Sequence, residues 1–333
     1  MNLNLSSRLG RGGLASPEED LLFTVDTSID TSLNISVQGG IGTIDWGDGS
    51  AVTPIVINTY SYSHSYPPAE IFQVRVTANA PYVNLAGQQS LISVENVGVL
   101  GYVDFGSMFE NCSNLVSFNA GNNVPEILGI QNMFKGCTSL SSANVKTFDT
   151  SRINNISSMF QNCNSLTTLD LSNWDTSNVG YNIETFRQCT ALGTLLLPDN
   201  FVTSSAVQLS AMLYDCQSLQ NLDVSTWDTS SVRSMNAIFV RCYGLTDIVG
   251  LETNISITGL NVTSGLANTA NSVPNQGTDY DALLINWEAN LPTSGLAQSP
   301  RFNLSKVTTT AGNNARISLI NNHNWVVLDG GPL

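Results

Sequence analysis

The stretch MFQNCNSLTTLDLSNWDTS, residues 159–177, decides the fold of this chain, because related copies of it recur on both sides. Its cysteine returns at intervals of 25 to 27 residues, at positions Cys112, Cys137, Cys163, Cys189, Cys216 and Cys242. Self-similarity at a period of about 20 to 50 residues is typical of a solenoid, in which each repeat buries its apolar face against its neighbours. The spacing therefore predicts a row of stacked repeats over residues 81–251.

The six cysteines occupy one equivalent position in each repeat, and we expect their side chains to form a buried structural ladder. Neighbouring rungs of such a stack lie about 5 Å apart, and parallel side chains at that spacing do not suit disulfide geometry. Free cysteine behaves as a small buried apolar residue. A zinc site is disfavoured, because the chain has no C-x-x-C pair and both histidines, His64 and His323, lie outside the repeats.

Each repeat divides into a strand, a turn and a compact segment before the cysteine. The alternation Leu-Asp-Leu at residues 169–171 predicts a short strand whose central side chain points outward. The Asp-Thr-Ser triplet at 175–177 offers side-chain oxygens that cap a turn, and the M-F-x-x-C segment fits a short helix. The triplet is missing at residues 195–200 and 121–125, where we expect a bulge or an altered loop. A partial copy at residues 91–97 predicts the first rung.

The outward-facing strand positions are the best candidates for a binding surface, because they tile one open face of the solenoid. In successive repeats they are Asn119, Asn144, Asp170, Leu196 and Asp223. The alternative is that these side chains are merely solvated. Trp174, Trp227 and Phe148 resemble carbohydrate-stacking aromatics, but their fixed place in the repeat favours a role as core anchors.

Residues 20–80 have a different pattern, with β-branched or alternating stretches separated by Gly, Asp, Asn and Pro. Such stretches predict strands, here at residues 21–26, 32–37, 43–46, 55–57 and 72–78. Short strands in this number make a small β-sandwich. Within IDWGDGS, residues 44–50, we expect Trp46 in the core and Asp45 and Asp48 capping the turn, with Ca²⁺ binding as the weaker alternative.

The two ends of the chain differ from both of these regions. Residues 1–19 are rich in Gly and Ser, and we expect an anchoring arm that docks in an assembly, or else packs on its own domain. Residues 252–333 lack the cysteine frame and predict two helices, at 280–291 and 311–321, and a strand at 325–329. Solenoids need atypical terminal units to cover the last apolar rung. This segment is therefore expected to be a capping module, with partner binding as the alternative.

Composition and charge disfavour several classes of protein. The net charge of −14 argues against nucleic acid and anionic membranes as partners, and no apolar run approaches the ~18 residues of a transmembrane helix. The N-terminus lacks the continuous apolar segment of a secretory signal. We find no G-x-S-x-G, H-E-x-x-H or phosphate-binding glycine loop, and no general acid is singled out beside Asp170 and Asp223. We therefore expect a protein without enzymatic activity, cofactor or metal.

With these residues in view, residues 81–251 resemble the BspA-like leucine-rich repeat family, whose units have the form M-F-x-x-C-x-x-L-x-x-L-D-L-S-x-[FW]-D-T-S. The resemblance implies an α/β solenoid with repeats of 25–27 residues and an α+β cap at 252–333. Residues 20–80 resemble a PKD-like domain, on the W-G-D-G-S turn, the H-x-Y triplet at 64–66 and the strand FQVRVTA at 72–78. Together with the N-terminal arm, these parts describe a multidomain chain.

The order of a PKD-like module, BspA-like repeats and a closing module is similar to that of structural and tail proteins encoded by tailed bacteriophages. The resemblance implies a non-enzymatic virion protein, displayed on the particle as a tail fibre, adhesin or capsid decoration, that binds a glycan or protein of the host surface. The arm and the sandwich would contact other virion proteins in a homo-oligomer or other symmetric assembly. The alternative is a bacterial cell-surface adhesin with the same scaffold, which we expect to carry a signal peptide or a sorting segment.

Overall fold

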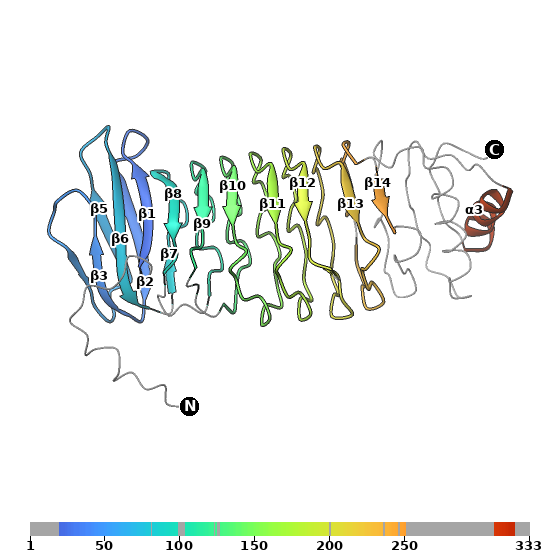
Figure 1. The fold of residues 1–333 in the computed structure, drawn as a ribbon, viewed down its shortest axis with the longest axis horizontal. Helices are drawn as coiled ribbons and strands as arrows, with labels where there is room; N and C mark the ends of the chain where they lie inside the picture. The colour runs from blue at the N-terminus through green and yellow to red at the C-terminus, as the bar shows by residue number, and fades with distance from the viewer. Residues whose placement is uncertain are drawn as a thin grey trace, which may run out of the picture.

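The computed structural model describes residues 20–250 and 310–323, except for residues 81, 99–103, 123, 125–126, 200, 236 and 246. The predicted arm at residues 1–19 and most of the predicted capping module lie outside the described residues. Within these ranges the protein is an elongated row of strands that begins with two antiparallel sheets and continues as stacked parallel rungs (Figure 1).

Two antiparallel sheets form the N-terminal part, as the alternation in residues 20–80 predicts. One contains, in this spatial order, β1 (Leu21–Asp26), β6 (Ile71–Asn79), β3 (Ile41–Asp45) and β4 (Thr53–Ile55). The other contains β5 (Ser61–Ser65), β2 (Ser32–Gln38) and β7 (Tyr82–Asn84). Side chains from both sheets, among them Phe23, Ile35 and Trp46, are buried in one core. Two strands were not predicted. In β5 the alternation of serine with Tyr62 and His64 is too polar to stand out, and β7 lies at residues that were predicted to belong to the solenoid.

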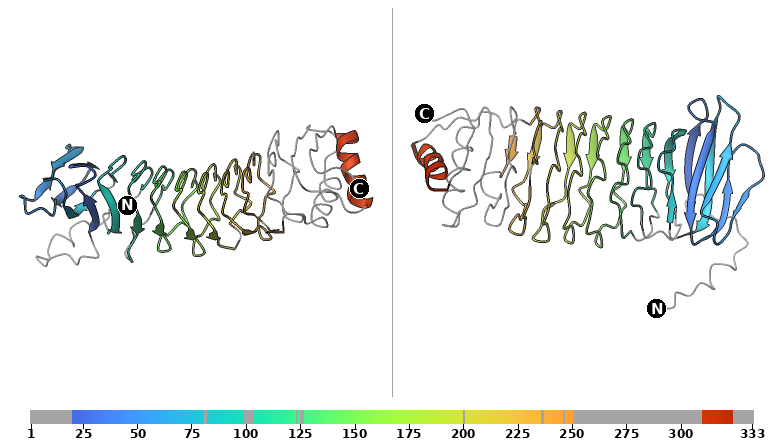
Figure 2. Two further views of the ribbon diagram at one scale, coloured as in Figure 1. Left: turned by 90° about the horizontal axis from the view of Figure 1, so that it is seen from above. Right: turned by 180° about the vertical axis from the view of Figure 1, so that it is seen from behind.

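The sheet that contains β1 continues into the solenoid without interruption. β1 pairs antiparallel with β8 (Leu91–Asn96), with Leu22 opposite Asn96 and Val25 opposite Leu91. β8 then pairs in parallel with β9 (Ser117–Asn119), the strand of the next rung. The antiparallel and parallel regions therefore share one backbone ladder, and β8 is the first rung that residues 91–97 predict. Two further views show the same progression from the sandwich into the rungs (Figure 2).

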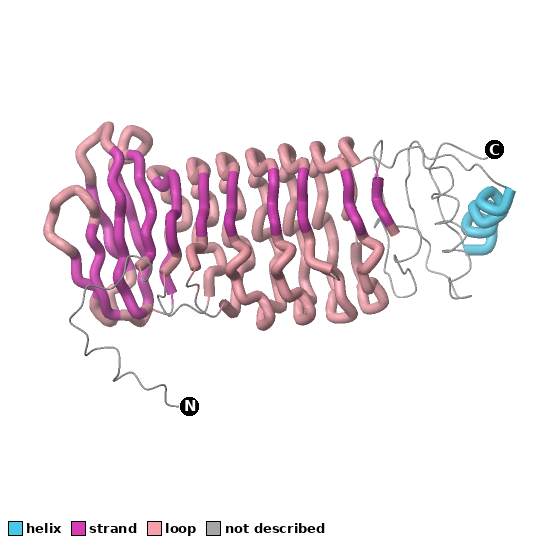
Figure 3. Tube along the Cα trace, in the orientation of Figure 1, coloured by secondary structure: helices cyan, strands magenta, loops and turns pink. Residues whose placement is uncertain are grey.

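Each repeat of the solenoid contributes one short parallel strand. The strands are β9 (Ser117–Asn119), β10 (Ser142–Asn144), β11 (Thr168–Asp170), β12 (Thr194–Leu196), β13 (Asn221–Asp223) and β14 (Asp247–Val249). They follow one another along one side of the molecule (Figure 3). β11 and β12 form one two-stranded sheet and β13 and β14 another. The strand ladder is thus interrupted between β10 and β11 and again between β12 and β13. The altered loop predicted at residues 195–200 begins at the end of β12.

The segment before each cysteine is a series of tight turns, so the predicted short helix is wrong. Two residues per repeat, five and one before the cysteine, have φ between 53° and 77°, whereas an α-helix needs φ near −63°. These residues are Ser107, Asn111, Asn132, Gly136, Ser158, Asn162, Glu184, Gln188, Ala211, Asp215, Ala237 and Arg241.

The hydrogen bonds of this segment explain why it cannot be helical. The N–H groups of Ser107, Phe109 and Asn111 donate to carbonyls of the next rung over 2.7–3.0 Å. The N–H groups between them, of Met108 and Glu110, close local turns over 3.1–3.2 Å. Every second N–H group is thus used between rungs, which leaves too few for a continuous helix. The solenoid is therefore mainly β with little helix, and not the α/β solenoid that the resemblance implies.

A stack of phenylalanine rings runs through the core of the solenoid. Phe109, Phe134, Phe160 and Phe186 are fully buried, and the centroids of neighbouring rings lie 5.4–6.1 Å apart with interplanar angles of 6–20°. Leu213 takes the equivalent place in the next repeat and ends the stack. Stacked aromatic pairs add to the stabilisation that burial gives each ring, so in these four repeats one phenylalanine ring links each rung to the next.

Helix α3 (Thr310–His323) agrees with the helix predicted at residues 311–321. Ala315 and Leu319 are its buried residues in the apolar core. The helix predicted at 280–291 and the strand predicted at 325–329 lie outside the described residues. In the part of the chain that the structure describes, no helix combines the length and apolarity needed to cross a membrane.

Candidate functional site

The predicted binding residues lie in one row along the solenoid. Each is the last residue of its strand: Asn119 in β9, Asn144 in β10, Asp170 in β11, Leu196 in β12 and Asp223 in β13. The middle residue of each strand points inward, so the last one faces outward. Four of the five are exposed and Asp170 is half-buried. The structure therefore brings the predicted residues together on one face.

The two aspartates of this row are also turn caps. Oδ1 of Asp170 accepts a hydrogen bond from the N–H of Ser172 over 3.0 Å. Oδ1 of Asp223 accepts the equivalent bond from the N–H of Ser225 over 2.8 Å. Side chains that bond to the backbone two residues later stabilise a turn. One oxygen of each carboxylate is thus committed to ending the strand, and the other oxygen of Asp170 forms an ion pair with Lys146.

The two asparagines cap their turns in the same way. Oδ1 of Asn119 and Oδ1 of Asn144 accept N–H groups two residues later over 3.3 and 3.5 Å. Asn144 also donates its Nδ2–H to Oδ1 of Asn119 over 2.9 Å, which links neighbouring rungs across the face. Leu196 carries no polar group and is 48% exposed. The row is therefore polar in four rungs and apolar in one.

Both carboxylates of the row are held ionised. Hydrogen bonds from Lys146, which forms an ion pair with Asp170, and from Ser172 lower the pKa of Asp170 to about 2. Hydrogen bonds from Ser225 lower the pKa of Asp223. A general acid must hold a proton near the working pH, so neither carboxylate suits that role. In the described ranges, no three His, Cys, Asp or Glu side chains gather to hold a metal ion.

The six cysteines lie in a buried row as free thiols. Each Sγ donates a hydrogen bond to a carbonyl of the preceding rung over 2.9–3.2 Å, for example from Cys163 to Phe134 and from Cys189 to Phe160. The thiols therefore satisfy backbone oxygens in the core as well as filling space, which the spacing alone does not reveal. Burial raises the pKa of Cys112 and Cys189 to about 12. The reactive thiolate form is suppressed accordingly.

The Asp-Thr-Ser triplets end in capped turns, as predicted. Their aspartates each accept a hydrogen bond from the serine N–H two residues later over 2.9–3.1 Å, at Asp149, Asp175 and Asp228. The hydrogen bonds from these serines lower the pKa of each carboxyl. The aromatic residues just before the triplets are only 3–4% exposed: Phe148, Trp174 and Trp227. They are core anchors, and their rings do not form a surface on which a sugar could stack.

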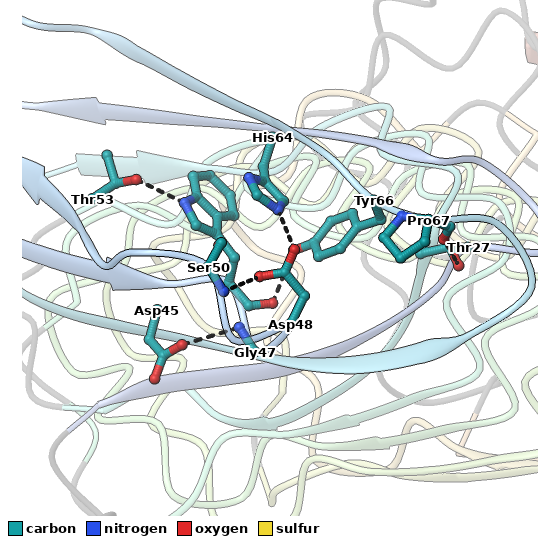
Figure 4. A network of polar contacts seen from close by, with 10 residues as sticks. Thr27, Asp45, Gly47, Asp48, Ser50, Thr53, His64, Tyr66 and Pro67 are labelled. Carbon is teal, nitrogen blue, oxygen red and sulfur yellow. Dashed lines mark hydrogen bonds and ion pairs between the residues drawn. The ribbon is translucent and has the colours of Figure 1, made fainter.

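A compact polar cluster surrounds the W-G-D-G-S turn of the sandwich (Figure 4). Asp45 accepts the N–H of Gly47 over 3.0 Å, and Asp48 accepts the N–H of Ser50 over 2.9 Å. Both carboxylates therefore cap the turn, as the sequence predicts. The second oxygen of Asp48 lies 2.7 Å from Nε2 of His64, so this carboxylate is shared between the turn and strand β5.

His64 lies among aromatic rings in an arrangement that the sequence did not predict. Its ring stacks on Trp46 with centroids 4.8 Å apart and meets Tyr66 edge-on at 4.6 Å. Burial alone raises the pKa of Asp48, but hydrogen bonds from Ser50 and His64 lower it to about 2. The histidine and the aspartate are 16 residues apart in the sequence, so only the fold shows that they meet. The cluster fastens β5 to the turn and is structural.

A group of arginine and tyrosine side chains on the solenoid was not predicted from the sequence. When the repeats are aligned on their cysteines, Arg187 and Tyr214 stand two residues before a cysteine, Asp215 and Arg241 one residue before, and Tyr243 one residue after. The three earlier repeats have only small or uncharged polar residues one place before and one place after the cysteine, but two of them have a charged residue two places before it, Glu110 and Lys135. The contrast at the places next to the cysteine is the signal that could have found Asp215, Arg241 and Tyr243. We name these five residues the arginine–tyrosine strip.

Comparisons with known proteins concern the repeats. One family model matches residues 103–196 and again residues 168–258. That family is DUF285. It is described as a Mycoplasma protein of unknown function, so the match concerns the repeats and names no activity. Among solved structures, a leucine-rich repeat protein of T. pallidum, TpLRR, is similar, with 21% sequence identity over 55% of this chain and 78% of that one and a TM-score of 0.39. Comparison with curated proteins finds no match.

Proposed function

We propose that this protein is a non-enzymatic structural component of a tailed-bacteriophage particle, displayed on its surface, where the solenoid binds a glycan or protein of the host. In this proposal the N-terminal sandwich is a PKD-like mount, and the DUF285 repeats are of the BspA-like kind. The protein is assembled in the host cytoplasm and carried on the virion.

The observation that carries the proposal is the outward row from Asn119 to Asp223. Five successive rungs present a side chain at the same place, at intervals of about 4.8 Å. Such a row suits an extended or repeating ligand, because several weak contacts made at once give an avidity that none of them has alone. The capped turns fix the polar side chains of the row, so little conformational entropy is lost when a ligand binds.

The N-terminal part supports display on a particle. The strands β1, β8 and β9 belong to one sheet, so force on the solenoid passes into the sandwich through backbone hydrogen bonds and not through a flexible linker. We propose that the sandwich and the arm at residues 1–19 contact other virion proteins, and that copies of the chain form a homo-oligomer or a symmetric ring.

Two features of the site support a binding role over catalysis. The thiols are buried with raised pKa values, so they are poor nucleophiles. The carboxylates of the row have lowered pKa values and are committed to turns. The second candidate, a bacterial cell-surface adhesin, uses the same row and differs in where the protein is attached.

Immunogold electron microscopy separates these two candidates. An antibody against residues 81–251 is applied to purified phage particles and to uninfected bacteria, with antibody pre-absorbed on the purified protein as the control. Regular gold on the particles is the expected result, and its position distinguishes a tail fibre from a capsid decoration. Gold on uninfected cells and none on particles contradicts the phage proposal and leaves the adhesin.

A further inference from the structure

We infer that the arginine–tyrosine strip is a binding site for an acidic sugar, a ring that carries a carboxylate as uronic acids do. The inference deepens the proposed function and rests on it only for the source of the sugar, the host surface. The strip is separate from the strand row, because its residues precede or follow the cysteines and do not belong to the strands.

The five side chains of the strip are contiguous across three rungs. The guanidinium carbon of Arg187 lies 4.8 Å from the centroid of the Tyr214 ring on the next rung. Nε of Arg241 lies 3.2 Å from Oδ1 of Asp215, again one rung apart. Hydrogen bonding to Tyr214, the charge of Asp215 and hydrogen bonding to Tyr243 raise the pKa of Arg241. A single ligand a few ångströms across can therefore touch several of them.

The donors of the strip are more exposed than its acceptor. The side chains of Arg241 and Arg187 are 47% and 33% exposed, whereas that of Asp215 is 5% exposed. Oδ1 of Asp215 also accepts a hydrogen bond from Nε2–H of Gln217 over 2.8 Å. Tyr243 is 48% exposed. Solvent therefore meets guanidinium N–H groups and a tyrosine ring, while the balancing carboxylate lies beneath them.

The hydrogen-bonding capacity of Arg187 is not filled by the chain itself. Its Nη1 donates to Oε1 of Glu184 over 2.5 Å, and Glu184 also accepts from Nε2 of Gln161 over 2.9 Å. Nε of Arg187 is enclosed and has no hydrogen-bond partner among the residues that the structure describes. A buried donor without a partner is uncommon in folded proteins. Because this Nε is enclosed, a surface ligand meets only the exposed remainder of the Arg187 side chain.

The chemistry of the ligand follows from these three observations. A planar guanidinium matches the two oxygens of a carboxylate, and an exposed tyrosine offers an apolar face with a polar edge. A sugar ring with a carboxylate presents both an apolar C–H face and a pair of anionic oxygens. The net charge of −14 opposes the approach of any anion, so we expect weak binding by one site and useful affinity only when several copies act together.

The test uses the full-length protein and a galacturonic acid hexamer, with the fully methyl-esterified hexamer as the neutral control. Titration followed by ligand-observed NMR is expected to give at least 5-fold tighter binding of the acid form. Arg241→Gln and Tyr243→Ser are each expected to weaken binding of the acid form at least 5-fold. Lys135→Gln, which stands in the place of Arg187 two repeats earlier, is the matched control and is expected to leave binding unchanged.

Unchanged melting temperatures show that the variants remain folded, and the exposed Tyr243 keeps the test valid should the Arg241 variant not fold. Equal binding of both hexamers, no binding of either, or an equal loss in the Lys135 variant overturns the inference. If the acid hexamer binds but the immunogold experiment finds no gold on phage particles, the proposed phage function is wrong and the inferred sugar site stands. If gold labels the particles but the hexamer does not bind, the sugar site is wrong and the proposed phage function stands.

Discussion

The Cys163 repeat and the Cys189 repeat are neighbours with the same frame and different contents. Both have the buried thiol, the stacked phenylalanine before it and the leucine three residues after it. Seven residues before the cysteine, the first repeat has Ile156 and the second has Asn182. Four residues before it, the first has Met159 and the second has Thr185. Asn182 and Thr185 are only 1% exposed. The Cys189 repeat therefore has polar groups in its core at places where the Cys163 repeat has apolar side chains.

The difference shows which features hold a rung in place. Thr185 donates to the carbonyl of Ile156 over 3.2 Å, but Nδ2 of Asn182 has no partner among the described residues. The Cys189 repeat is also one residue longer, and its outward residue is Leu196 where its neighbour has Asp170. The rung-to-rung hydrogen bonds and the thiol row nevertheless continue through it, and the phenylalanine stack reaches it through the contact of Phe160 with Phe186. These three features set the repeat, and the remaining positions are free to change.

The largest effect is expected from a charge placed in the shared frame. Cys163→Asp buries a carboxylate among apolar side chains and is expected to lower the free energy of unfolding by several kcal/mol, roughly 3 or more. Cys163→Ala removes only the thiol and its hydrogen bond to Phe134, at a cost of about 1–2 kcal/mol. Urea denaturation followed by tryptophan fluorescence measures both. Equal, small losses for the two variants would mean that the thiol row is not part of the core.

A second prediction makes the irregular repeat regular. Asn182→Ile combined with Thr185→Met copies the core of the Cys163 repeat, and it is expected to raise the free energy of unfolding by about 1–3 kcal/mol, because an unpaired buried amide is removed. Ile156→Asn in the regular repeat is the reverse control and is expected to destabilise. A loss of stability in the double variant would show that the polar pair is satisfied in the folded protein.

The smallest effect concerns acid stability. The pKa of Asp170 is lowered to about 2 in the folded chain, below the value of about 3.9 in an unfolded chain. Its contribution to stability is therefore complete above about pH 4 and is lost as the pH falls through about 2. Asp170→Leu, which copies Leu196, is expected to show a smaller loss of stability between pH 5 and pH 2.5 than the parent. The difference stays below about 1 kcal/mol because solvent reaches the ion pair, in which the side chains of Lys146 and Asp170 are 45% and 30% exposed. If the parent and the Asp170→Leu variant lose the same stability between pH 5 and pH 2.5, the lowered pKa of Asp170 does not contribute to stability and the prediction is wrong.

The features that the sequence predicted correctly are those that each repeat, strand or helix encodes locally. The period of the cysteines gave the stacked rungs, the alternation at residues 21–26 gave β1 without error, and α3 was found within two residues at each end. The candidate row followed from the same period, because one outward position per strand is fixed once the strands are known.

The features that the sequence did not reveal depend on contacts between distant segments. The M-F-x-x-C segment has apolar spacing that fits a helix, but its N–H groups bond to the next rung and hold alternate residues out of helical geometry. The pairing of His64 with Asp48 needs β5 to fold back over the turn. The contacts within the arginine–tyrosine strip depend on the stacking of three rungs, since no two of its charged residues are close in the sequence.

The central claim is that one continuous core runs through the regular and the irregular repeats. Thiol titration tests it most directly, because each repeat contributes one buried cysteine to that core. The protein is treated with a chromogenic disulfide reagent at pH 8 over a series of urea concentrations. The account predicts no reactive thiol in the native protein and the release of all six cysteines in a single transition. A thiol that reacts in the native state, a disulfide that remains after unfolding, or the early release of Cys189 ahead of Cys163 would contradict it.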